Sequence, residues 1–262
     1  ALYDIAAQAA NQPLYAFLGG QQKPIESDLT IGIGTPEDMA KQAVAFVAKG
    51  VTMIKVKLGK QPADDIERIK QIRSAIGEKT ILRIDANQGW SKEEALPVLT
   101  ALSVYDIQFC EQPMHKYYDD YLPALCAASP IKIMADESVF THHEARKLIQ
   151  QKACHYINIK FSKSGGIHEA IKIHDIGKAN GIACMMGGML ESRLALTAKV
   201  HFAMAHDNIH FYDMDTCLLG HKEDPVIGGV QFNGMHISIS DSPGIGATVD
   251  PNYLSKLESC VV

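Results

Sequence analysis

Short apolar runs recur along the chain about every 25 residues, and each is followed by a segment with helical periodicity. The runs are apolar at consecutive positions, which is typical of strands that are covered on both faces, as in a parallel sheet. The predicted strands are LTIGIG (29–34), IKVKLG (54–59), ILRIDAN (81–87), IQFCEQP (107–113), IKIMADES (131–138), YINIKFS (156–162), IACMMGG (182–188) and HFYDMD (210–215). The intervening helices are predicted from Thr35 and at 62–76, 91–103, 117–128, 142–153, 167–180 and 191–206.

Eight strands with seven intervening helices predict an α/β fold, a TIM-like barrel of the modified (β/α)7β kind. A doubly wound sheet is the alternative, and the even spacing of the strands favours the barrel. One helix is predicted over residues 1–18, and a hairpin is predicted around Asn233-Gly234, between VQF and MHISIS. We therefore expect three parts: a helix and connector (1–24), the catalytic barrel (25–220) and a C-terminal hairpin and extension (221–262).

Composition excludes several function classes. The 262 residues carry a net charge of −5, which gives no basic footprint for nucleic acid, and no apolar run is long enough to span a membrane. The histidines form no metal-binding spacing, and His142 and His143 are expected to cap a helix or face solvent. Six scattered cysteines without a CxxC pair predict free thiols in a reducing compartment, hence a cytoplasmic protein, which we expect to be a homo-oligomer. They are Cys110, Cys126, Cys154, Cys184, Cys217 and Cys260.

Two lysines one residue apart, Lys55 and Lys57, stand in an otherwise apolar strand. A period of two places both on one face of that strand. One interpretation is an edge strand that shows lysines to water and so blocks edge pairing. The other is a buried pair that carboxylates or a metal site must compensate. A closed barrel has no edge, so the predicted fold favours the second interpretation.

Carboxylates end three successive predicted strands, at Asp85, Glu111 and Asp136, and lysine-bearing strands flank them. Their oxygens form a site that suits a hard divalent cation, most plausibly Mg2+. Such a cation acidifies the α-C–H of a bound carboxylate substrate, because it stabilises the enolate charge that develops. A lysine on each side, with a pKa lowered by burial and nearby cations, could remove or return the proton. The alternative for each carboxylate is a helix cap or a salt bridge, and Glu137 and Ser138 suit such structural work.

Five motifs in order, IKVKLG, RIDANQGW, CEQP, ADES and NIKFSKSGG, resemble the muconate-lactonising-enzyme-like subgroup of the enolase superfamily. The resemblance covers roughly residues 25–220 and implies an enolase-type C-terminal barrel that binds Mg2+ through Asp85, Glu111 and Asp136. It implies that Lys57 and Lys160 are the two acid/base groups. Lys55 would sit beside Lys57 and lower its pKa, and Asn87 and Asn158 are weaker supporting candidates.

Asp213-Met214-Asp215 looks like the DxD motif of dipeptide epimerases, in which two carboxylates hold the α-ammonium of the substrate. Alternation along a strand would put Asp213 and Asp215 on one face, which makes an acidic site for a cation. The resemblance therefore predicts an isomerase, a Mg2+-dependent dipeptide epimerase that acts by 1,1-proton transfer at the α-carbon of the C-terminal residue. The alternatives within the superfamily are an N-acylamino-acid racemase, an o-succinylbenzoate synthase or a muconate cycloisomerase.

Other function classes stay open at this level. A Schiff-base aldolase would use one lysine and leave the three strand-end carboxylates unexplained, and a non-enzymatic binding barrel would show no α-proton exchange. Lys163 is expected to be a loop residue, and Ser164-Gly165-Gly166 a tight turn rather than an anion site. Superfamily members carry an N-terminal capping domain that is absent from this sequence, so we expect the isolated chain to be poorly active.

Overall fold

The computed structural model describes residues 1–219 and 223–259, which form two compact units. Unit 1 contains Ala1–Glu26, Gly188–Asp207 and the described residues of Met214–Val262, and unit 2 contains Ser27–Gly187 and Asn208–Asp213. Cys260 and the predicted boundary at residues 220 and 221 lie outside the described residues. None of the helices in the described ranges combines the length and hydropathy that a membrane crossing requires.

Unit 2 is built on one parallel sheet of eight strands, which follow one another in sequence order. They are β2 (Leu29–Ile31), β3 (Met53–Lys57), β4 (Ile81–Asp85), β5 (Ile107–Glu111), β6 (Ile133–Ala135), β7 (Tyr156–Ile159), β8 (Ala183–Gly187) and β9 (Ile209–Asp213). The sheet is nearly closed, because the backbone N–H of Asp28, just before β2, donates to the carbonyl of Tyr212 in β9 at 3.1 Å. The predicted barrel is confirmed. The doubly wound alternative is wrong, because strand order does not reverse at any point.

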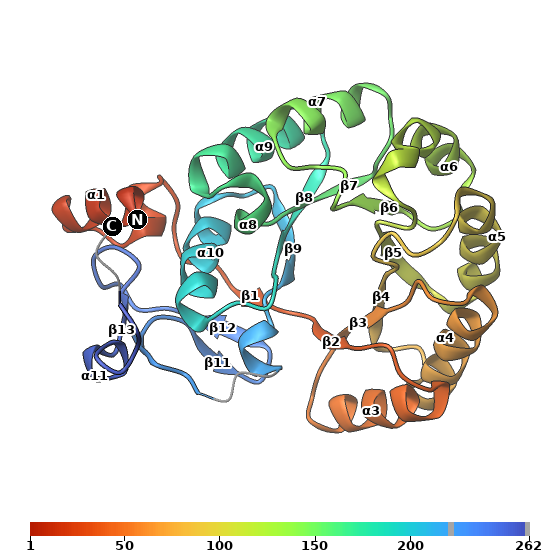
Figure 1. Ribbon diagram of the computed structural model, residues 1–262, viewed down its shortest axis with the longest axis horizontal. Coiled ribbons are helices and arrows are strands. Elements are labelled where there is room, and N and C mark those ends of the chain that lie inside the picture. The colour runs from red at the N-terminus through yellow and green to blue at the C-terminus, as the bar shows by residue number, and fades with distance from the viewer. Residues whose placement is uncertain (220–222, 260–262) are drawn as a thin grey trace. The chain divides into compact units, whose positions relative to one another are not determined.

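A helix follows each of the strands β2 to β7 within unit 2. They are α3 (Pro36–Ala48), α4 (Pro62–Ile76), α5 (Lys92–Leu102), α6 (Leu122–Ala128), α7 (His142–Gln150), α8 (Phe161–Ser164) and α9 (Ile167–Ala179). Helices α3 to α7 lie on the outer side of the curved sheet (Figure 1). Thr35 and Ser91 cap the N-termini of α3 and α5, because each side chain accepts a hydrogen bond from the backbone N–H three residues later. The predicted helix at 117–128 is correct only in part, because a 3-10 helix, η2 (Lys116–Tyr121), precedes α6.

The barrel interior contains an aromatic and methionine layer beneath the strand ends. Phe109, Met134 and Met185 are fully buried there, and Tyr156 and Phe211 pack against them. Phe109 and Met134 lie two residues before Glu111 and Asp136, so each pair shares a face of its strand. The layer therefore lies beneath the polar residues at the strand ends, and the buried guanidinium of Arg83 lies over its Phe109 and Phe211 rings, 5.4 Å from each centroid.

Unit 1 contains the remaining helices and short antiparallel sheets. Its elements are α1 (Leu2–Ala9), α2 (Leu14–Phe17), α10 (Arg193–Ala205), η3 (Thr216–Leu218), α11 (Pro251–Leu254), β1 (Ile25–Glu26), β10 (Val226–Gly228), β11 (Gln231–Asn233), β12 (His236–Ser238) and β13 (Ala247–Val249). The hairpin predicted around Gly234 is confirmed, as β11 pairs with β12 and Gly234 has φ +59°. The single helix predicted over 1–18 is wrong, because Asn11 has φ +51° and Pro13 is extended, which breaks the helix.

Candidate active site

The predicted catalytic and metal-binding residues of unit 2 all lie at the carboxyl ends of strands. Lys57, Asp85 and Glu111 are the last residues of β3, β4 and β5, and they are paired in register across the sheet. Asp136 and Lys160 directly follow β6 and β7, and Asp213 ends β9. The carboxyl ends of parallel strands meet at one end of a barrel, so the fold gathers residues that are 156 positions apart in the printed numbering, from 57 to 213.

Lys55 lies at the centre of this group and is 1% exposed. Its ammonium nitrogen is 2.7 Å from Glu111, 2.8 Å from Asp213 and 3.1 Å from Asp85. Burial would lower the pKa of Lys55, but the carboxylates, Asp213 foremost, raise it well above its usual value. Since β3 lies between β2 and β4, the lysines do not guard an edge. The three carboxylates thus favour the charged form of Lys55, which contacts all of them.

The two candidate acid/base lysines each contact a different carboxylate. Nζ of Lys57 is 2.7 Å from Oδ2 of Asp85, and the Lys57 side chain is 28% exposed. Nζ of Lys160 is 2.7 Å from Oδ2 of Asp136 and 3.7 Å from Glu111, and its side chain is 5% exposed. β3 and β7 are separated in the sheet by the three strands whose ends bear the carboxylates. The lysines therefore flank the carboxylates on both sides.

Lys160 is held in its charged form. Burial would lower its pKa, but Glu111 and Asp136 outweigh this effect, and the pKa of Lys160 lies above its usual value. The expected lowering of a lysine pKa is therefore not found at Lys160, because carboxylates rather than cations dominate its surroundings. The pKa of Asp136, the ion-pair partner of Lys160, shifts in the opposite direction. Burial would raise it, but Lys163 and Lys160 lower it to about 2.

Lys163 belongs to this site, and the prediction that it is a loop residue is wrong. The side chain is 9% exposed, forms an ion pair with Oδ1 of Asp136, and donates to the carbonyl of Asn158 at 3.2 Å. Lys163 lies in α8, and Lys160 is the N-terminal cap of this helix. Residues three apart in a helix share a face, so the Lys160-to-Lys163 spacing was the signal that could have found it. Gly165 and Gly166 form the predicted turn, with φ of +80° and +118°.

The amide side chain of Asn158 and the carboxyl side chain of Glu137 complete the surroundings of the lysines and carboxylates. Asn158 is fully buried and donates from Nδ2 to Oε1 of Glu111 at 2.7 Å, which fixes that carboxylate. The sequence predicts that Glu137 caps a helix or forms a salt bridge. Its Oε2 atom is buried without a hydrogen-bond partner, so this oxygen makes neither contact. Burial and the neighbouring charge of Asp136 raise the pKa of Glu137 to about 7. Asn87 has φ +44°, and its backbone N–H donates to Asp85 at 2.8 Å.

Asp213 and Asp215 do not share a strand face, so the argument from alternation is wrong. β9 ends at Asp213, whereas Asp215 has helical backbone angles (φ −91°, ψ −7°) and precedes η3 in unit 1. Both are buried, at 4% and 0% exposure. Burial would raise the pKa of Asp213, but Lys55 and Lys160 lower it, so its carboxylate is ionised.

The strand-end carboxylates fit a divalent cation by their chemistry. Asp85, Glu111 and Asp136 offer only oxygen, the ligand that Mg2+ prefers. Within the described part of the chain, no three His, Cys, Asp or Glu side chains are already arranged around one metal position. The physical reason is that a lysine ammonium contacts each carboxylate. A cation would therefore replace ammonium contacts on the same oxygens.

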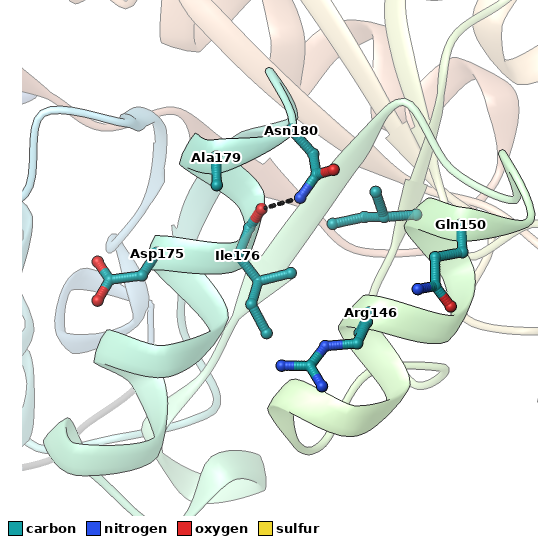
Figure 2. A pocket seen from close by; sticks show the side chains of 7 residues that line it. Arg146, Gln150, Asp175, Ile176, Ala179 and Asn180 are labelled. Carbon is teal, nitrogen blue, oxygen red and sulfur yellow. Dashed lines mark hydrogen bonds between the residues drawn. The ribbon is translucent and has the colours of Figure 1, made fainter.

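A separate hollow of about 370 Å3 lies between α7 and α9, on the outside of the barrel (Figure 2). Arg146 and Gln150 line it from α7, and Asp175 and Asn180 lie on the other side, where Asn180 donates to the carbonyl of Ile176 at 2.8 Å. Its polar groups come from helix surfaces and none comes from a strand end. It therefore has no part in the chemistry of the lysine and carboxylate group.

Comparison with known proteins agrees with this architecture. Residues 38–253 match the family described as Enolase C-terminal domain-like. The D-Ala-D/L-Ala epimerase of Cytophaga hutchinsonii is 44% identical over 264 aligned residues, which cover 100% of this chain and 72% of the relative. The L-Ala-D/L-Glu epimerase of Clostridium acetobutylicum is 40% identical over 94% of this chain and 69% of its own length.

A solved structure with the same fold is the dipeptide epimerase of Cytophaga hutchinsonii in complex with Mg and the dipeptide D-Ala-L-Val. It superposes with a TM-score of 0.96 at 45% identity, over 98% of this chain and 70% of the other. At this similarity the strand ends that bear the lysines and carboxylates belong to a shared barrel framework.

Proposed function

The chain belongs to the enolase C-terminal domain-like family, and from this premise we propose that it is a Mg2+-dependent dipeptide epimerase. This isomerase inverts the α-carbon of the C-terminal residue of a dipeptide. The observation that carries the proposal is the order of residues around the barrel end: Lys57, then the carboxylates of Asp85, Glu111 and Asp136, then Lys160. The five free thiols of the described chain support a cytoplasmic location.

Asp85, Glu111 and Asp136 are the residues that would hold Mg2+. When bound, the cation supplies positive charge that stabilises the enolate charge developing on the substrate carboxylate. Asn158 and Lys55 keep Glu111 in place through contacts of 2.7 Å each. Buried neighbours therefore fix the orientation of the Glu111 carboxylate oxygens.

Lys57 and Lys160 are the proposed proton carriers. One lysine removes the α-proton of one stereoisomer and the other returns a proton on the opposite face of the planar intermediate, which inverts the carbon. Lys160 is the donor in the resting state, since its carboxylate neighbours keep it protonated. Lys55 has a supporting role in this proposal, because it contacts three carboxylates. Lys57 contacts one carboxylate and Lys160 contacts two.

Asp213 and Asp215 are the proposed partners of the substrate's α-ammonium. Asp213 is ionised, and its Oδ2 accepts from Lys55 at 2.8 Å, so this carboxylate already binds one ammonium group and has the charge to bind a second. This contact would select a dipeptide with a free amino terminus. The second candidate, an N-acylamino-acid racemase, shares the lysines and carboxylates but has no use for such a contact.

The proposal is tested by α-proton exchange in D2O. A library of L,L-dipeptides is incubated with the protein and Mg2+, and loss of the α-proton signal of the C-terminal residue is followed by NMR. For the best substrate, both stereoisomers are then assayed with Lys57→Ala and Lys160→Ala. Each variant should exchange at most one stereoisomer and form no epimer. If both variants still epimerise fully, the proposed mechanism is wrong.

A further inference from the structure

Asp65 is a buried carboxylate outside the proton-transfer site, and all its hydrogen-bonding capacity is used. It lies in the first turn of α4 and is fully buried. Oδ2 accepts from the backbone N–H groups of Gly59 and Lys60 at 2.9 and 3.2 Å, and from Nε1 of Trp90 at 2.9 Å. Oδ1 accepts from Nη1 of Arg68 at 2.8 Å. Four donors fill the roughly four lone-pair positions of a carboxylate.

Three of the four donors come from loops that directly follow strands of the site, and the fourth, Arg68, lies in α4. Gly59 and Lys60 belong to the loop after β3, two and three residues beyond Lys57, and Trp90 belongs to the loop after β4. Arg68 also donates from Nε to the carbonyl of Gly34 at 2.9 Å, in the loop after β2. One carboxylate therefore ties together the loops at the ends of three neighbouring strands.

The two loops after β3 and β4 are in close backbone contact, with no space for a side chain between them at Gly59 and Gly89. A Cβ atom on Gly59 would lie 2.0 Å from the carbonyl oxygen of Ala86, and one on Gly89 would lie 2.0 Å from the carbonyl oxygen of Gly59. The backbone N–H of Leu58 donates to the carbonyl of Asp85 at 2.8 Å. Displacement of the Gly59 loop is thus transmitted through one residue, Leu58, to Lys57.

We propose that Asp65 is a positioning residue that fixes Lys57 for proton transfer by holding the loops after β3 and β4. This inference rests on the proposed function, in which Lys57 and Lys160 serve opposite faces of the α-carbon. The hydrogen-bond partners given above for Asp65 lie in the loops after β3 and β4 or in α4, and none of them lies in or directly after β7, the strand before Lys160. Loss of the Asp65 contacts therefore impairs one proton carrier and spares the other.

The test compares the two directions of exchange in Asp65→Asn at saturating Mg2+. An amide is neutral and has one acceptor oxygen, so it cannot satisfy both Arg68 and the loop donors, and the hydrogen bonds that hold the loops are weakened. The stereoisomer whose exchange is lost in Lys57→Ala should exchange at least tenfold more slowly, because small misplacements of a reacting group cost one to two orders of magnitude. The stereoisomer lost in Lys160→Ala should change less than about threefold. Asp64→Asn is the matched control, since Asp64 is adjacent and exposed, and it should leave both rates unchanged.

A second variant covers the case in which Asp65→Asn fails to fold. Trp90→Phe keeps the buried ring and removes only the Nε1 donor, and it should shift the ratio of the two rates in the same direction by a smaller factor. Trp90 is the one tryptophan in the sequence, so a red shift of its emission in Asp65→Asn reports release of the indole whatever the activity. Equal slowing of both stereoisomers, or no slowing in either variant, overturns the inference. Absence of exchange in the wild-type protein instead overturns the proposed function.

Discussion

The ammonium nitrogen of Lys57 lies 2.7 Å from Oδ2 of Asp85, and the two residues are directly opposite in the register of β3 and β4. A candidate base and a candidate metal ligand thus form one ion pair. Any cation that binds Asp85 competes with Lys57 for the same oxygen, so metal binding and release of the lysine are coupled.

Replacement of Asp85 by Asn should weaken Mg2+ binding by at least about tenfold, because the site loses one negative charge and one strong oxygen ligand. Calorimetric titration with Mg2+ measures this change directly. EDTA should abolish α-proton exchange in the wild-type protein, and added Mg2+ should restore it. Asp64→Asn is the control and should bind Mg2+ as the wild type does. Unchanged affinity in Asp85→Asn would remove this residue from the ligand set.

Lys55→Met should destabilise the protein by about 3–5 kcal/mol, because three buried carboxylates lose their shared counter-charge. Urea unfolding followed by circular dichroism gives the free energy of unfolding. Lys41→Met is the control, since Lys41 is exposed and its ion pair with Asp38 is 3.9 Å long. It should unfold at the urea concentration of the wild type. A loss below about 1 kcal/mol in Lys55→Met would contradict the central role of this lysine.

Gly59→Ala and Gly50→Ala form a matched pair at positive φ. Gly50 (φ +85°) has open space where a Cβ would lie, so its replacement should cost only the backbone strain of about 1–2 kcal/mol. Gly59 (φ +98°) would place a Cβ 2.0 Å from the Ala86 carbonyl oxygen, which is backbone and cannot rotate away. Its replacement should cost about 3 kcal/mol more than that of Gly50. Equal unfolding free energies of the two variants would disprove the close approach.

His201 should make stability depend on pH below neutrality. It is fully buried, its Nδ1 accepts from the backbone N–H of Tyr15 at 3.1 Å, and its Nε2 lies 3.1 Å from the carbonyl of Ile245, so the ring is neutral. Burial lowers its pKa in the folded state, so the unfolded chain binds the proton more readily. The stabilising effect is therefore complete above the unfolded pKa of about 6.5 and is lost as the pH falls toward the folded pKa.

The measurement is the free energy of unfolding at several values between pH 7.5 and 5. It should fall at up to about 1.4 kcal/mol per pH unit below about pH 6.5. His201→Gln should flatten this slope, whereas replacement of the exposed His210 by Gln should leave it intact. An identical slope in wild type and His201→Gln would assign the pH dependence to other groups.

Asp213→Asn should lower kcat/KM for a dipeptide by at least about tenfold, because the α-ammonium loses a charge-assisted partner. An N-acetylated dipeptide serves as the control, used as a competitive inhibitor. It has no ammonium, so its inhibition constant should be the same in wild type and variant. If Asp213→Asn weakens inhibition by the N-acetylated dipeptide as much as it lowers kcat/KM for the free dipeptide, Asp213 acts through Lys55 rather than through the substrate's ammonium group.

The sequence by itself predicted where the candidate catalytic residues lie, because the ends of the strands can be recognised from it. Apolar runs marked the strands, and Asp85, Glu111, Asp136 and Lys160 were found at or directly after their last residues. In a parallel barrel this position alone brings side chains together, since carboxyl ends of all strands meet at one end. The period of two likewise put Lys55 and Lys57 on one face before any contact was known.

Only the tertiary structure decided which groups contact each other and in what charge state. Lys163 enters the site through α8, Asp65 binds the loops after β3 and β4, and the Tyr15-to-His201 bond spans 186 residues of sequence. The strand periodicity also failed at Asp215, where the chain had already turned into η3. Local patterns fix which way a side chain points along its own element. Ion pairs, and the pKa values that follow from them, depend on distances between elements, which the fold alone sets.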